Sequence, residues 1–196
     1  MFVAITGPVA CGKSSIARFF SDQWPDIVQV VQADNYYHDR SDMPELERTE
    51  HHINYDEPSS IDFELLLAHL VRLRSGFEVA DAPTYDFVTH TRRYDRVLMP
   101  KKIVIVEGHQ LVHGIPKSLF AWNFMVYVDT GLDVCFERRL VRDTTHRSKF
   151  DVAMQHFYRT LPAHHKYGVH QRQQCDIVSS DVEHIKQTLV ILALIH

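Results

Sequence analysis

Hydrophobic residues occur along this chain in short continuous runs that alternate with segments of helical period. Uninterrupted runs of β-forming residues predict strands that are buried on both faces, as in a parallel sheet. Segments with apolar residues three and four positions apart predict amphipathic helices that cover such a sheet. Strands are expected at residues 2–6, 28–33, 103–106, 124–128 and 177–179, and helices at residues 13–20, 61–74, 132–147, 152–161 and 182–195. The pattern therefore predicts an α/β fold in which helices cover both faces of a parallel sheet.

Residues 77–100 depart from this alternation. Around Tyr85-Asp86-Phe87 and Arg92-Arg93-Tyr94 the side chains alternate without a helical period. This predicts a small β-hairpin, inserted over residues 76–100 at one end of the sheet. We expect the whole chain, residues 1–196, to form a single domain around this insertion.

Composition and charge narrow the class of protein. A chain of 196 residues with 45% hydrophobic and 23% charged residues is ordinary for a globular domain. Its net charge of −4 provides no overall basic field, so neither nucleic acid nor a membrane surface is an expected partner. Three widely spaced cysteines without a CxxC pair predict a reducing compartment. Because the apolar runs are short and the amino terminus lacks the basic residues of a signal peptide, we expect a cytoplasmic protein.

The residues between the first strand and the first helix form a phosphate-binding motif. Gly7-Pro8-Val9-Ala10-Cys11-Gly12-Lys13-Ser14 fits G-x-x-x-x-G-K-[ST] at every fixed position, and Ser15 follows it. The backbone N–H groups of such a loop and the dipole of the next helix attract phosphate oxygens. Lys13 is expected to reach the β- and γ-phosphates of ATP or GTP, and Ser14 to place its hydroxyl on Mg²⁺. A chance glycine turn is the alternative, but the flanking strand and helix favour nucleotide binding and a fold of the P-loop NTPase type.

Three carboxylates, Asp34, Glu107 and Asp129, follow or end predicted strands, at the edge where an open α/β sheet binds its ligands. Asp129, before Thr130-Gly131, is expected to form a turn. Glu107 ends the most apolar run, and Asp34 ends the second strand. Phosphoryl transfer needs an acid that supports the metal and another near the attacking hydroxyl. Glu107 is therefore the candidate metal-side acid and Asp34 the candidate orienter of the acceptor. A helix cap or a turn is the alternative for each.

Arginines gather on the helix predicted to end near residue 147. Arg138 and Arg142 are four positions apart and Arg139 and Arg142 three apart, which places them on one side of the helix. Arg147 and Lys149 follow in a polar stretch. We expect residues 143–151 to form a lid that closes over phosphates, with a solvated charged face as the alternative.

Histidine is abundant, with 14 residues in the chain. His109 and His113 have the i, i+4 spacing of a helical pair of metal ligands, but Gly108 and Gly114 beside them argue against a regular helix. Surface histidines are therefore expected, with a structural metal site as the minor alternative.

Several segments beyond the phosphate loop resemble the uridine kinase family of P-loop kinases. Gln32-Ala33-Asp34-Asn35-Tyr36-Tyr37 is similar to its Q-D-x-[FY]-Y element. Asn54-Tyr55-Asp56-Glu57-Pro58, followed by Ile61-Asp62-Phe63, is similar to its N-[FY]-D-x-P…FD segment. Tyr85-Asp86-Phe87-Val88-Thr89-His90-Thr91-Arg92 resembles its Y-D-[FY]-x-x-H-[ST]-R signature, which is the most specific part of the match. Matches around Glu107, Asp129, Arg138 to Asp143 and Lys166 to Val178 extend the resemblance over nearly the whole chain.

The resemblance implies an enzyme of pyrimidine salvage that phosphorylates the 5′-hydroxyl of uridine or cytidine with ATP or GTP and Mg²⁺. Asp34 is implied as the base or orienter of that hydroxyl, and Lys13, Arg139 and Arg142 as further catalytic groups. The implied nucleoside contacts are Asp56 at the ribose 2′- and 3′-hydroxyls, Tyr85 and His90 at the pyrimidine edge, Phe87 as a wall, and Arg139 and Lys149. Arg147 is implied to join Arg142 in the lid. Since the family is typically homotetrameric, a homo-oligomer is expected.

The lid differs from the R-D-x-x-x-R-G-R pattern of the family, because Ser148 and Lys149 stand where the family has glycine and arginine. Lysine keeps the charge but lacks the planar fork of arginine. Two alternatives therefore stay open. One is a kinase of another small alcohol, such as nicotinamide riboside, pantothenate or ribulose 5-phosphate. The other is a nucleotide-binding protein without turnover, although that protein would need only the loop and not Asp34, Asp56 and Glu107.

Overall fold

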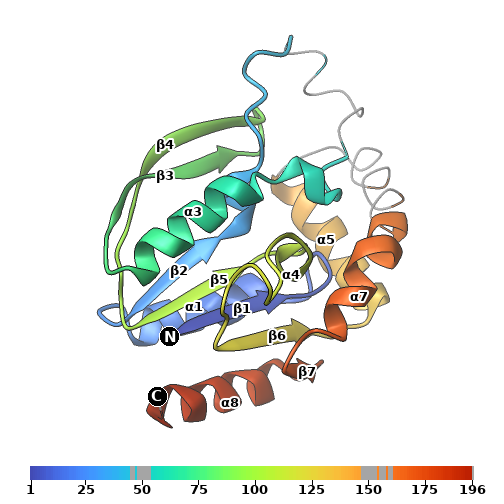
Figure 1. The fold of residues 1–196 in the computed structure, drawn as a ribbon. Coiled ribbons are helices and arrows are strands. Elements are labelled where there is room, and N and C mark those ends of the chain that lie inside the picture. Colours follow the sequence, from blue (N-terminus) through green and yellow to red (C-terminus); the bar gives the residue numbers. More distant parts are fainter. Residues whose placement is uncertain (45–46, 48–53, 147–153, 155–157, 159–160, 196) are drawn as a thin grey trace.

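The computed structural model describes residues 1–44, 47, 54–146, 154, 158 and 161–195. At its centre the described residues form a parallel sheet of five strands in the order β2-β5-β1-β6-β7 (Figure 1). The strands are β1 (Phe2–Thr6), β2 (Val28–Gln32), β5 (Ile103–Glu107), β6 (Phe124–Val128) and β7 (Ile177–Ser179). The predicted α/β fold with a parallel sheet is confirmed.

The central strands divide their apolar runs between two buried clusters. In β1, Phe2 and Ala4 belong to one cluster, whereas Val3 and Ile5 belong to the other. Successive side chains of a strand point to opposite faces of the sheet, so a continuous apolar run supplies both clusters. This explains why the strands lack the polar alternation of a sheet with one solvated face.

Helices cover both faces of the sheet (Figure 1). Residues of α1, α5 and α8 belong to the cluster of Val3, and residues of α3 and α4 to the cluster of Phe2. The α-helices are α1 (Lys13–Gln23), α3 (Phe63–Arg74), α4 (Leu111–Gly114), α5 (Leu132–His146), α7 (Val169–Arg172) and α8 (Val182–Ile195). The described residues also form two short 3₁₀-helices, η1 (Ala33–Tyr36) and η2 (Pro58–Ser60), and a π-helix, η3 (His164–Gly168). None of the described helices is long and apolar enough to cross a membrane.

Some boundaries differ from those predicted. α3 begins at Phe63 and not at Ile61, because the Asp62 side chain caps it by accepting a hydrogen bond from the Leu65 backbone N–H at 3.0 Å. β2 ends one residue early, since the chain turns into η1. α4 forms a single helical turn where the neighbouring glycines predicted no regular helix. Residues 147–151 of the predicted lid, and most of the helix predicted at 152–161, lie outside the described residues.

The insertion is a two-stranded antiparallel hairpin of β3 (Val79–Asp86) and β4 (Thr91–Leu98), as predicted. Figure 1 shows α3 between the hairpin and the main sheet. The backbone N–H of Tyr85 donates a hydrogen bond to Asn35 Oδ1 at 3.2 Å, which ties the hairpin to η1. The hairpin signature is thereby held next to the segment that carries Asp34.

Candidate active site

The phosphate loop connects β1 to α1 through backbone conformations that favour glycine. Gly7 has a φ of 143° and Gly12 a φ of 111°. A Cβ on Gly7 would lie 2.6 Å from the carbonyl oxygen of Val128, so a side chain has no room there. The Thr130 hydroxyl donates a hydrogen bond to the Cys11 carbonyl at 2.9 Å, which fixes the loop to the end of β6. The loop is thus held against the end of β6 at two points, Gly7 and Cys11.

The Lys13 side chain is buried within this loop. Its Nζ donates hydrogen bonds to the carbonyl oxygens of Gly7 at 3.1 Å and Pro8 at 2.7 Å, and it lies 3.6 Å from Cys11 Sγ. The loop therefore holds the ammonium group at the place where phosphates are expected. Its contact with the β- and γ-phosphates stays a prediction.

Ser14 and Glu107 meet at the carboxyl end of the sheet. The Ser14 hydroxyl donates a hydrogen bond to Glu107 Oε1 at 2.9 Å. Burial and the nearby negative charge of Asp34 raise the pKa of Glu107. A Cβ on Gly108 would lie 2.6 Å from Ala33 Cβ, so this glycine lets β5 end close to η1 and to Asp34. Hydroxyl and carboxylate oxygens are the ligands that Mg²⁺ prefers, and the Ser14–Glu107 pair fits this ion.

These groups open onto one cavity of about 240 Å³. Both acidic and basic side chains line it, which suits a polyphosphate with a bound cation. Its ionic and hydroxyl lining consists of Lys13, Ser14, Ser15, Asp34, Glu107, Arg138 and Arg142, and Val9 and His109 also contribute. We call it the phosphate cavity.

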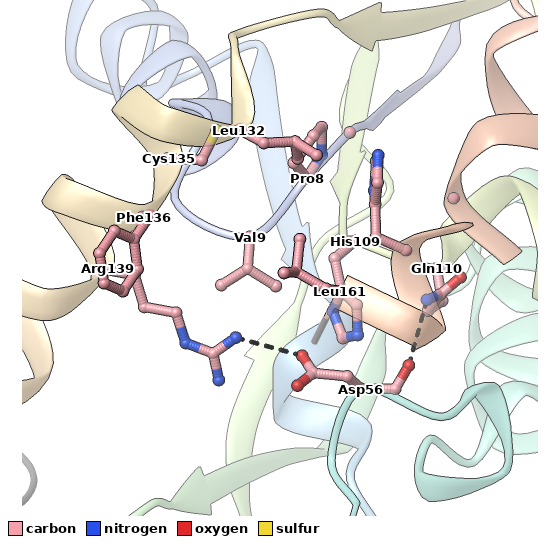
Figure 2. Close-up of a pocket in the computed structure, with 13 residues that line it drawn as sticks. Pro8, Val9, Asp56, His109, Gln110, Leu132, Cys135, Phe136, Arg139 and Leu161 are labelled. Atoms are coloured by element: carbon pink, nitrogen blue, oxygen red, sulfur yellow. Dashed lines mark hydrogen bonds and ion pairs between the residues drawn. The ribbon is translucent and has the colours of Figure 1, made fainter. Parts of the chain in front are cut away.

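A second pocket lies beside the phosphate cavity and contains Asp56, which is buried (Figure 2). Arg139 Nη1 from α5 lies 3.5 Å from Asp56 Oδ1, and the Gln110 amide donates a hydrogen bond to the Asp56 carbonyl at 3.2 Å. Figure 2 shows both contacts, with Asp56 between the two side chains. We call this the Asp56 pocket. It shares Val9 and His109 with the phosphate cavity.

The arginines of α5 serve both cavities. Arg138 and Arg142 line the phosphate cavity, whereas Arg139 lines the Asp56 pocket. Buried Asp143 holds two of them, since it accepts hydrogen bonds from Arg139 Nε at 3.3 Å and Arg142 Nε at 2.9 Å. Arg139 therefore lines the neighbouring pocket, although it shares Asp143 with Arg142. Arg147 and Lys149 lie outside the described residues.

The hairpin residues of the candidate nucleoside site gather around two tyrosines that the sequence did not single out. Tyr37 packs against Tyr85 and Phe87, with ring centroids 5.3 Å and 6.0 Å away. The Tyr55 hydroxyl lies 2.7 Å from Nδ1 of His90 and accepts a hydrogen bond from the Tyr85 hydroxyl at 3.5 Å. Both tyrosines stand inside the segments that carry the family resemblance. Their position beside Asp34 and Asp56 was a signal that could have been used.

Known proteins match this chain along most of its length. A family model described as "Phosphoribulokinase / Uridine kinase family" matches residues 2–187. The uridine kinase of Shewanella sp. (strain W3-18-1) is 41% identical over 155 residues, which cover 76% of this chain and 71% of the relative. The chain belongs to the phosphoribulokinase/uridine kinase family. It is therefore a phosphotransferase that acts on an alcohol, and the family implies ATP as the phosphate donor.

Solved structures share the fold of this kinase at low sequence identity. Phosphoribulokinase from Rhodobacter spheroides has a TM-score of 0.63 at 12% identity, covering 90% of this chain and 68% of that one. D-Glycerate 3-kinase from Cryptococcus neoformans var. grubii has a TM-score of 0.60 at 15% identity, covering 87% and 79%. These likenesses concern the arrangement of sheet and helices and not the acceptor.

His109 contradicts the expectation of surface histidines in this kinase. Its side chain is 8% exposed, and its Nδ1 lies 3.7 Å from Asp34 Oδ1. His69 is also buried, with a ring nitrogen 2.9 Å from the Tyr36 hydroxyl. The i, i+4 spacing to His113 drew attention to a metal site. The useful signal was instead the place of His109 directly after Glu107-Gly108, at the ligand-binding edge of the sheet.

Gln171 on α7 is a further residue that the sequence did not reveal. It is fully buried, and its Oε1 accepts hydrogen bonds from the Thr6 hydroxyl at 2.9 Å and the Val112 N–H at 3.0 Å. Its Nε2 donates to the His109 carbonyl at 3.0 Å. Gln171 therefore fastens the end of β1 to the segment that carries His109 and Gln110. A lone glutamine in a polar stretch gives no pattern that would indicate this role.

Proposed function

We propose that this kinase transfers the γ-phosphoryl group of ATP to the 5′-hydroxyl of a pyrimidine ribonucleoside, uridine or cytidine. The observation that carries the proposal is that Asp34 and Asp56 line adjoining cavities that share Val9 and His109. A ribonucleoside presents its 5′-hydroxyl at one end of the sugar and a vicinal diol at the other, so two separated carboxylates suit the two ends. The 41% identity to a uridine kinase supports the same acceptor.

The phosphate cavity would bind the donor. In the proposal the backbone of residues 7–15 holds the phosphates, and Lys13 and Arg142 stabilise the charge on the transferring group. Mg²⁺, held by Ser14 and Glu107, would supply further neutralisation of the phosphate charge. GTP is the alternative donor. Arg147, which lies outside the described residues, is proposed as a further lid residue.

Asp34 would act on the acceptor. Its carboxylate orients the 5′-hydroxyl and takes its proton as the new O–P bond forms and the bond to the β-phosphate oxygen breaks. The transition state of phosphoryl transfer is loose, so in-line positioning of the 5′-oxygen contributes more than early deprotonation. The 3.7 Å contact with His109 helps to define where the Asp34 carboxylate lies.

The sugar and base would be bound by residues from three elements. Asp56 accepts hydrogen bonds from the ribose diol, with Arg139 beside it. Tyr85 and His90 contact the pyrimidine edge and Phe87 forms a wall. Lys149, outside the described residues, is proposed as a further nucleoside contact. The proposal includes a cytoplasmic role in pyrimidine salvage and a homo-oligomeric assembly.

A panel of acceptors tests this function. The purified protein is assayed with ATP and Mg²⁺ on uridine, cytidine, nicotinamide riboside, pantothenate and ribulose 5-phosphate, and the products are located by phosphorus NMR. We expect kcat/KM for uridine or cytidine to exceed that for the other acceptors by about 100-fold or more, because a site built to bind a base rejects molecules that leave its polar groups unpaired. Preference for another alcohol, or ATP binding without transfer to any of them, would contradict the proposal.

A further inference from the structure

The ring of His109 carries a buried nitrogen that has no partner. Its Nε2 is buried and makes no hydrogen bond within the part of the chain that the structure describes. The side chain as a whole is 8% exposed. Buried polar atoms of folded proteins are nearly always hydrogen-bonded, so an unpaired one at the edge of a cavity marks a place for a ligand atom.

Three contacts hold His109 in place, and two of them involve its ring. Its face stacks on Tyr37, with ring centroids 6.5 Å apart and an interplanar angle of 29°. Its backbone carbonyl accepts the hydrogen bond from Gln171. Its Nδ1 faces the Asp34 carboxylate at 3.7 Å. Since Nδ1 faces this carboxylate, Nε2 is the ring nitrogen left to hydrogen-bond a ligand.

The position of the ring indicates which group of a ligand this nitrogen meets. His109 lines both the phosphate cavity, with Asp34, and the Asp56 pocket (Figure 2). If the proposed function holds, the 5′-oxygen lies at Asp34 and the ribose diol at Asp56. The 3′-carbon lies between the 5′-arm and the 2′-carbon of the sugar, so its hydroxyl is the donor nearest to a group that stands between the two carboxylates.

We infer that Nε2 of His109 accepts a hydrogen bond from the ribose 3′-hydroxyl of the acceptor, an inference that rests on the proposed function. His109 is then a substrate-binding residue that selects sugars with a free 3′-hydroxyl, next to Asp56. The same imidazole then contacts both cavities: Nδ1 faces the Asp34 carboxylate, and Nε2 binds the sugar.

The test combines a variant with altered sugars. His109→Phe keeps a flat ring against Tyr37 and removes both nitrogens, and kcat/KM is measured with uridine, 3′-deoxyuridine and 2′-deoxyuridine. We expect His109→Phe to lower kcat/KM for uridine by about 10-fold, the size of one good hydrogen bond. The ratio of uridine to 3′-deoxyuridine should shrink by the same factor, while the ratio of uridine to 2′-deoxyuridine stays as in the parent.

Matched variants separate binding from structural support. His113→Phe changes an exposed histidine four residues away and should leave all three rates and both ratios unchanged. His109→Gln places an amide oxygen where it can accept the hydrogen bond. This variant should restore most of the ratio of kcat/KM for uridine to that for 3′-deoxyuridine, even where the phenylalanine variant folds poorly. ADP affinity, measured by calorimetry with Mg²⁺, reports on the fold of each variant.

The outcomes distinguish the two proposals. A parent protein that phosphorylates no ribonucleoside overturns the proposed function and this assignment with it. A second outcome is a parent that phosphorylates uridine while His109→Phe and His109→Gln lower kcat/KM equally for all three nucleosides. In that case the ratio of kcat/KM for uridine to that for 3′-deoxyuridine is unchanged. His109 is then a structural support, and the assignment alone is overturned.

Discussion

The phosphate cavity and the Asp56 pocket lie side by side but are assembled in opposite ways. In the first, Lys13 and Ser14 belong to one short motif, and Glu107 ends a strand of the central sheet. In the second, Asp56 is held by Gln110 and Arg139, which are 54 and 83 residues away along the chain. One cavity is encoded by local sequence and sheet geometry, whereas the other depends on the packing of distant segments.

The difference predicts how each cavity responds to change. In the proposed function, groups in the phosphate cavity act on the reacting phosphoryl group, so their loss should lower turnover. Groups in the Asp56 pocket would bind parts of the acceptor that do not react, so their loss should weaken acceptor binding with a smaller effect on the chemical step. Substitutions on the two sides should therefore separate kcat from KM.

The largest effect is expected for Lys13→Ala. The substitution removes a cation from the phosphate cavity and leaves the carbonyl groups of Gly7 and Pro8 without their donor. We expect kcat/KM to fall by about 10³-fold or more, as for other groups that stabilise the transferring phosphoryl group, with weaker ADP binding. Lys117→Ala, which removes an exposed ion pair with Asp176, should leave both unchanged. Near-parental turnover of Lys13→Ala would exclude the phosphate-loop assignment.

Asp34→Asn is expected to have the next largest effect. The amide keeps the shape of the carboxylate but cannot accept the proton of the attacking hydroxyl, so kcat should fall by about 10²–10⁴-fold. The acceptor KM should change little in steady-state assays. Asp129→Asn is the matched control, since Asp129 directly follows β6 and pairs with Arg172. A parental kcat for Asp34→Asn would show that this carboxylate does not act on the acceptor.

On the other side of the comparison, Asp56→Asn should act mainly on binding. Losing the charge weakens the contact with Arg139 and, in the proposed function, the hydrogen bonds to the ribose diol. We expect the nucleoside KM to rise by about 10- to 100-fold, as for the loss of hydrogen bonds to a charged group, with kcat reduced less. For the parent, 2′-deoxyuridine should already be a poor substrate. Equal losses in kcat for Asp34→Asn and Asp56→Asn would remove the distinction between the cavities.

The same contrast explains what the sequence could predict. Gly7, Lys13 and Glu107 stand next to strands whose apolar runs are unmistakable, and strand ends in a parallel sheet converge by geometry, so their meeting place follows from local patterns. The partners of Asp56 follow from no local rule. Arg139, unlike Arg142, lies within 3.5 Å of Asp56, and this contact exists only in the folded chain.

His109 and Gln171 show more clearly which features a single sequence does not predict. Both are polar residues that sequence patterns place on the surface, yet both are buried. Gln171 is compensated by at least three hydrogen bonds to distant groups, which no spacing rule anticipates. Burial of a polar side chain depends on such partners, and a single sequence does not name them.

The smallest expected effect concerns the base end of the acceptor site, through Tyr55→Phe. The Tyr85 hydroxyl donates to the Tyr55 hydroxyl, and burial together with this hydrogen bond raises the pKa of Tyr85, so Tyr85 stays protonated. Tyr55 can then direct its own hydrogen to Nδ1 of His90, 2.7 Å away. In that arrangement His90 carries its hydrogen at Nε2, and an N–H donor suits the carbonyl at position 4 of uracil better than the amino group of cytosine.

Tyr55→Phe removes the hydrogen bond that favours this tautomer, so discrimination between uridine and cytidine should weaken. We expect the ratio of kcat/KM for uridine to that for cytidine to fall by about 3- to 10-fold in Tyr55→Phe, the size of one neutral hydrogen bond, with an unchanged KM for ATP. Tyr94→Phe, at an exposed position on β4, is the control and should keep the parental ratio. An unchanged ratio in Tyr55→Phe would mean that the cluster of Tyr37, Tyr55, Tyr85 and Phe87 supports the hairpin and does not select the base.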